Sequence, residues 1–128
     1  MRGLFFAAAT VMIAGCASAP TPELHPTWYE TVQSGRIDPA QSRRMADCVA
    51  DGWGGAHGVL VNVTMAREQR AEGSRIEART NGSVLARADI GDDGTATMFQ
   101  WAHAPVILST ERATFADCLA QSKGLSTR

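Results

Sequence analysis

The dipeptide Asn81-Gly82 limits the fold of this chain more than any other local feature. It lies between two segments, 74–80 and 83–90, in which polar and apolar residues alternate. Alternation with a period of two is typical of strands, and Asn-Gly favours a type I′ turn because both of its central positions take positive φ. The sequence therefore predicts a β-hairpin over 74–90 and, with it, an antiparallel sheet.

Further strands are expected on both sides of this hairpin. Residues 58–65 are mostly apolar and β-branched, and a second turn, Gly91-Asp92-Asp93-Gly94, leads to residues 95–101. Each segment is short and is bounded by glycine, asparagine or aspartate, as strands usually are. We expect about four antiparallel strands that follow one another as a meander.

A helix is expected before the strands and another after them. Asp38, Pro39 and Gln41 occupy the N-cap, N1 and N3 positions of a capping box. Ser109 is expected to cap a second helix that ends at Gly124. The predicted order is α-β-β-β-β-α. We expect an α+β fold with the N-terminal and C-terminal helices on one face of the sheet.

Composition excludes several classes of protein. The chain has 128 residues, which is the length of one domain, and a formal net charge of −1. This charge argues against nucleic-acid binding, which needs a basic surface. The hydrophobic fraction of 45% is too high for a disordered chain. No apolar run approaches the roughly 20 residues of a membrane-spanning helix.

The N-terminus has the pattern of an export signal. Arg2 supplies a positive charge, and the apolar or small residues from 4 to 13 are too few to span a bilayer but suit the apolar region of a signal peptide. The sequence Ile13-Ala14-Gly15-Cys16 follows. It resembles the lipobox of bacterial lipoproteins, which places an aliphatic residue and two small residues before an obligatory cysteine.

This resemblance implies a lipid anchor. The thiol of Cys16 would receive diacylglycerol, a peptidase would cut after Gly15, and the new amino group would be acylated, commonly with palmitate. Two or three long acyl chains make anchoring effectively permanent. Since Ala17 rather than aspartate follows the cysteine, the resemblance implies the outer membrane, facing the periplasm. The alternative is an ordinary secretory signal with cleavage after Ala19.

Three regions are expected along the chain. Residues 1–15 form the lipoprotein signal peptide, and 16–37 form the lipidated cysteine with a tether rich in proline. Residues 38–128 form a small globular domain. This domain resembles small uncharacterised proteobacterial lipoproteins, and that resemblance implies no specific role. Trp28 and Tyr29 interrupt the tether. They could pack on the domain or enter the lipid headgroups.

With Cys16 lipidated, Cys48 and Cys118 remain as a pair. They lie in similar hexapeptides, Met45–Ala50 and Phe115–Ala120, one in each expected helix. An even number of cysteines in an exported protein favours a disulfide. Closing this loop would stabilise the domain by roughly 4 kcal/mol in the chain-entropy model. The alternative is two buried free thiols.

Residues with catalytic or ligand-binding chemistry are few. His57 and His103 both lie in expected connectors, so a shared site is conceivable, but no carboxylates stand near them at the spacing of metal ligands. We therefore expect no metal, no cofactor, no catalytic residue and no enzymatic activity.

Arg75, Arg79 and Arg87 form a candidate partner-binding face on the middle strands, where glutamates and aspartates interleave with them. Cross-strand charge pairs on a solvated sheet face also explain this pattern. The function predicted from the sequence is a non-enzymatic envelope lipoprotein, anchored to the membrane through Cys16, with a structural or partner-binding role toward an envelope protein. The alternative is a small periplasmic inhibitor or sensor that binds an incoming enzyme or ligand.

Overall fold

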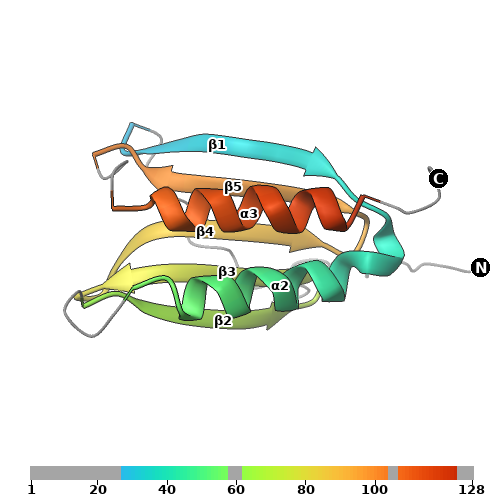
Figure 1. The fold of residues 1–128 in the computed structure, drawn as a ribbon, viewed down its shortest axis with the longest axis horizontal. Coiled ribbons are helices and arrows are strands. Elements are labelled where there is room, and N and C mark those ends of the chain that lie inside the picture. The colour runs from blue at the N-terminus through green and yellow to red at the C-terminus, as the bar shows by residue number, and fades with distance from the viewer. Residues whose placement is uncertain (1–26, 58–61, 104–106, 124–128) are drawn as a thin grey trace, which may run out of the picture.

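The computed structural model describes residues 27–57, 62–103 and 107–123. These ranges form a five-stranded antiparallel sheet with two helices on one face (Figure 1). The strand order across the sheet is β1-β5-β4-β3-β2. The elements along the chain are β1 (Tyr29–Arg36), the 3₁₀ turn η1 (Pro39–Gln41), α2 (Ser42–Gly54), β2 (Thr64–Arg70), β3 (Gly73–Thr80), β4 (Ser83–Gly91), β5 (Thr95–Trp101) and α3 (Ser109–Gln121).

The hairpin predicted at Asn81-Gly82 is confirmed. Asn81 has φ of 50° and Gly82 has φ of 83°, as a type I′ turn requires. The α+β class, the antiparallel sheet and the two helices on one face are confirmed as well.

The predicted number of strands was too low. Residues 29–36, which we expected to belong to the tether, form the edge strand β1 and pair with β5. The pairing joins Tyr29 to Trp101, far away in the sequence, so it leaves no local turn signal. A register shift between Thr31 and Gln33 also breaks the alternation of the strand. The order is therefore β-α-β-β-β-β-α, and the folded part of the chain begins before Asp38.

The strand expected at 58–65 lies further along the chain. Residues 58–61 are outside the described ranges, and β2 runs from Thr64 to Arg70. Its C-terminal half is charged, which hides the strand pattern. Charged residues are common on edge strands because they discourage pairing with other chains.

The helix starts also differ slightly from the prediction. Asp38 does act as a cap, since its carboxylate accepts the Ala40 amide at 3.0 Å, but it caps η1 rather than α2. The α-helix itself begins at Ser42. At the second helix, Leu108 rather than Ser109 occupies the N-cap position.

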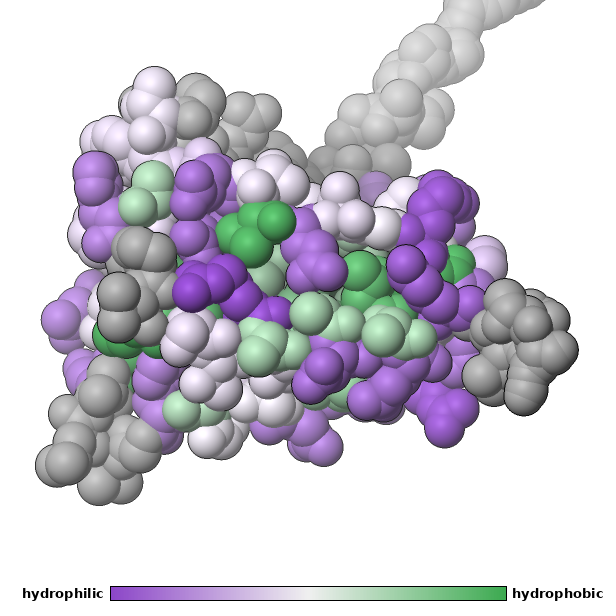
Figure 2. Space-filling model, turned by 45° about the horizontal axis from the view of Figure 1, so that its top comes forward, coloured by the Kyte–Doolittle hydropathy of each residue, from purple (hydrophilic) through white to green (hydrophobic). Residues whose placement is uncertain are grey.

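The core lies between the sheet and the helices. The sheet contributes four buried alanines, which leave room for larger helix side chains such as Met45, Val49 and Phe115. The helices approach each other closely at Gly52, where an added Cβ would lie 2.4 Å from the Thr114 methyl group. Figure 2 shows the outer surface from the β1 side, where short apolar patches are interrupted by polar residues.

A disulfide joins the two helices, as the sequence predicted. Cys48 and Cys118 are bonded with a Cα–Cα distance of 5.8 Å across a sequence separation of 70 residues. Cys118 is buried, and Cys48 packs against the same core. None of the described helices has both the length and the apolar character needed to cross a membrane.

Candidate functional site

Neither α2 nor α3 lies on the other face of the sheet, which we call the open face (Arg75, Glu77, Arg79, Arg87, Asp89, Thr97 and Phe99). Strand alternation places these side chains there because their neighbours along the strands, such as Ala78, Ala88 and Met98, belong to the core. The open face is therefore the surface that the sheet itself can present.

Direct cross-strand partners form ion pairs on the open face. Arg75 is opposite Asp89 and Glu77 is opposite Arg87 in the β3–β4 register. The Arg75 Nε donates to Asp89 Oδ1 at 2.7 Å and its Nη2 donates to Oδ2 at 3.2 Å. Glu77 accepts from Arg87 Nε at 2.8 Å and from Arg79 Nε at 2.9 Å. The cross-strand charge pairs expected from the sequence are present.

The expectation that these pairs lie on a solvated face was wrong. The exposed fraction is only 7% for Arg75, 4% for Glu77 and 5% for Arg87. The side chain of Arg79, in contrast, is 47% exposed. Of the three arginines proposed for partner binding, Arg79 thus offers the most accessible charge. Arg75 and Arg87 are held in place by carboxylates, and Arg87 has further contacts besides Glu77.

The surroundings shift two pKa values on this face. Burial raises the pKa of Tyr29, whose hydroxyl donates to the Val84 carbonyl at 2.6 Å. Burial would also raise the pKa of Glu77, but the hydrogen bonds and charges of Arg79 and Arg87 together outweigh it, and the pKa of Glu77 lies below its usual value. Glu77 is therefore ionised at neutral pH, and it binds two arginines.

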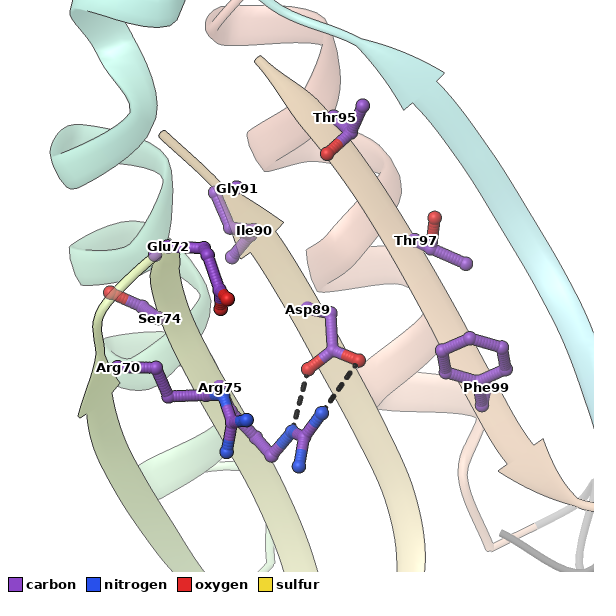
Figure 3. Close-up of a pocket in the computed structure, with 11 residues that line it drawn as sticks. Arg70, Glu72, Ser74, Arg75, Asp89, Ile90, Gly91, Thr95, Thr97 and Phe99 are labelled. Carbon is purple, nitrogen blue, oxygen red and sulfur yellow. Dashed lines mark hydrogen bonds and ion pairs between the residues drawn. The ribbon is translucent and has the colours of Figure 1, made fainter. Parts of the chain in front are cut away.

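A hollow of about 270 Å³ opens at one end of the open face (Figure 3). The Arg75–Asp89 pair lies in the middle of its floor, with Thr97 and Phe99 on the β5 side and Glu72 at the opposite rim. Thr97 and Phe99 were not among the site residues predicted from the sequence. In β5 they alternate with Ala96 and Met98, which belong to the core. This period of two could have placed Thr97 and Phe99 on the open face.

The two histidines are not brought together by any contact in the described ranges. His57 Nε2 lies 2.6 Å from Glu111 Oε2, and Glu111 is completely buried with its other oxygen, Oε1, lacking a hydrogen-bond partner. His103 instead packs edge-on against Trp101, with ring centroids 5.6 Å apart.

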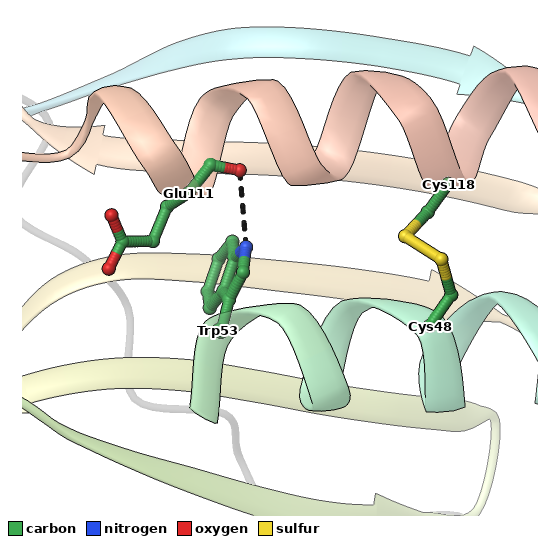
Figure 4. Close-up of a disulfide and its surroundings, with 4 residues drawn as sticks. All are labelled: Cys48, Trp53, Glu111 and Cys118. Carbon is green, nitrogen blue, oxygen red and sulfur yellow. Dashed lines mark hydrogen bonds between the residues drawn. A yellow bond between two sulfur atoms is a disulfide. The ribbon is translucent and has the colours of Figure 1, made fainter. Parts of the chain in front are cut away.

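Glu111 also ties the two helices together. Its backbone carbonyl accepts the Trp53 indole N–H at 3.2 Å, at the opposite end of the helix pair from the disulfide (Figure 4). The His57–Glu111 contact has no local sequence signal because 54 residues separate the partners. Within the described ranges, no group of three or more His, Cys, Asp or Glu side chains could hold a metal ion.

Cys16, the predicted site of lipid attachment, and the proline-rich part of the tether lie outside the described residues. The comparisons with known proteins do not assign the chain to a family. It matches no family model, no curated protein and no solved structure.

Proposed function

We propose that this chain is a lipid-anchored, non-enzymatic binding module of the bacterial cell envelope. The lipobox at Ile13-Ala14-Gly15-Cys16 supports the anchor. The Cys48–Cys118 disulfide supports a place outside the cytosol, where such bonds persist. Ala17 after the lipidated cysteine favours the outer membrane, with the domain in the periplasm.

The hollow on the open face is the observation that carries the binding role. Its floor is held rigid by the Arg75–Asp89 pair, so a partner would meet a preorganised surface. Thr97 offers a hydroxyl and Phe99 offers an aromatic surface beside it. Aromatic side chains and arginine are the residues most enriched where proteins bind one another.

The size of the hollow favours a protein partner over a small molecule. Small-molecule sites usually occupy about 300–1,000 Å³ and enclose most of their ligand. The hollow measures about 270 Å³ and is open to one side. It suits one or two side chains of an envelope protein. An incoming enzyme that the module inhibits would be one such partner.

Site-specific photo-crosslinking in the living cell tests this binding role. A photoreactive residue in place of Thr97 should give a discrete crosslinked product with an envelope protein, since this position lines the hollow. The same residue in place of Asp51, which is exposed on α2, is the matched control. The proposal would be contradicted by the absence of a product from position 97, or by identical products from both positions.

Metabolic labelling with an alkyne fatty acid tests the anchor separately. The natural chain should incorporate the label, whereas Cys16→Ala should remain unlabelled and uncut because the thiol that accepts the lipid is gone. Normal labelling of the variant would refute the anchor at this position.

A further inference from the structure

The exposed large apolar side chains of the described ranges gather at one end of the molecule. They are Trp28, Trp101 and Ile107, which are 55%, 36% and 38% exposed. The backbone carbonyl of Trp28 accepts the N–H of Ala102 at 2.8 Å. Ala102 follows Trp101 directly in the chain. Ile107 lies two residues before α3. Figure 1 shows that β1 begins, β5 ends and α3 begins at this same end of the sheet.

This end is also where the tether reaches the domain. The described chain starts at Thr27, next to Trp28, and eleven residue steps separate Thr27 from Cys16. A fully extended chain of that length spans at most about 40 Å, and a relaxed one spans less. A cysteine fixed in a bilayer therefore keeps Trp28 within about 40 Å of the membrane, so this end of the domain can reach the headgroups.

Tryptophan is suited to this location. Its ring is largely apolar and its N–H can still meet water or headgroups, so tryptophan is enriched at the membrane–water interface. We propose, on the basis of the lipid anchor proposed above, that the end of the domain formed by Trp28, Trp101 and Ile107 docks into the headgroup region of the membrane that holds Cys16.

Docking at this end fixes the orientation of the domain. The hollow extends from Phe99, two residues before Trp101, to the turn at Asp92 and Asp93 at the other end of the sheet. Strand β3 has eight residues and spans about 26 Å. The far side of the hollow, at Glu72 and Gly91, would then lie up to about this distance from the bilayer, toward soluble or membrane-spanning partners.

Quenching of tryptophan fluorescence by brominated lipids tests the docking. The lipidated protein is reconstituted in vesicles of phosphatidylethanolamine and phosphatidylglycerol that contain dibrominated chains. The chain has three tryptophans, and Trp53 is buried. The natural protein should lose most of the emission of its two surface tryptophans. Trp28→Phe/Trp101→Phe, which retains Trp53, should lose almost none.

A matched control places a tryptophan at the far end of the sheet. Asp92→Trp, made in the Trp28→Phe/Trp101→Phe background, should emit without quenching because Asp92 is exposed beside the hollow. Equal quenching of this variant and of the natural protein would show that the domain has no fixed orientation and would overturn the docking.

The remaining outcomes separate the docking from the anchor. If mass spectrometry finds acyl chains on Cys16 but the surface tryptophans are not quenched, the docking is wrong and the anchor stands. If these tryptophans are unquenched by lipid yet shielded from acrylamide in water, a protein covers this end instead, and the docking is again overturned. A bare Cys16 overturns both.

Discussion

Glu77→Gln tests the energetic role of the open face most sharply. Glu77 and Arg87 are both almost fully buried, and the change removes a carboxylate that binds two arginines while preserving shape. Removing one partner of a buried ion pair typically costs about 3–5 kcal/mol. Arg79 is half exposed, so the loss of the carboxylate affects it little, and Arg87 has further contacts. We therefore expect Glu77→Gln to lower the free energy of unfolding by about 3 kcal/mol, at the lower end of this range.

Urea unfolding at neutral pH measures this loss. With a slope of about 2 kcal/mol per molar, the midpoint should fall by about 1.5 M. Glu68→Gln is the matched control, because its carboxylate is 62% exposed and lies 3.5 Å from Arg70. The control should change stability by less than about 1 kcal/mol.

The pH dependence of the same variant provides an independent check. The folded pKa of Glu77 is lowered, so the stability that it contributes is fully present above its ordinary pKa of 4.5 and is lost as pH falls through the lower, folded value. The difference between the natural protein and Glu77→Gln should therefore shrink in acid. A cost below about 0.5 kcal/mol at neutral pH, or a difference that widens in acid, would refute the reasoning.

Three further predictions concern the helix layer. Cys48→Ala/Cys118→Ala should lower the free energy of unfolding by roughly 4 kcal/mol, and unchanged stability under reducing conditions would argue against a stabilising disulfide. His57→Ala should cost about 3 kcal/mol in urea unfolding because it leaves the buried carboxylate of Glu111 without its hydrogen-bond partner; a neutral effect would show that the contact is unimportant. Gly52→Val should lower the melting temperature by several degrees because the new side chain would overlap α3. Gly54→Val, in more open space, should lower it clearly less. Equal decreases in melting temperature would contradict the close packing of the two helices.

The parts of the fold that the sequence predicted have local signals. The hairpin at Asn81-Gly82 follows from the dihedral preferences of two adjacent residues. The disulfide follows from two cysteines in similar helical surroundings. Strand β1 has no such signal, because its partner β5 lies about 65 residues away and its register shift disturbs the alternation.

The site was predicted only in part for similar reasons. The interleaved charges indicated cross-strand charge pairs on the middle strands. Exposure depends on everything that surrounds a residue in the fold, so the local pattern did not show that Arg75 and Arg87 are buried. Glu111 lies in the first turn of α3, where acidic residues are common, so its type and position alone do not mark it as a site residue. Only the packing of the two helices shows that it is buried and meets His57.

The lipid anchor is tested most directly by the mass of the N-terminal tryptic peptide of the mature protein from membranes. The chain has no lysine or arginine between Cys16 and Arg36, so the expected peptide spans these two residues. Its mass should exceed that of the bare peptide by a diacylglycerol group, with a further acyl chain where the amino group is modified. An unmodified peptide that begins at Cys16, or one that begins at Pro20 after ordinary secretory cleavage, would contradict the anchor.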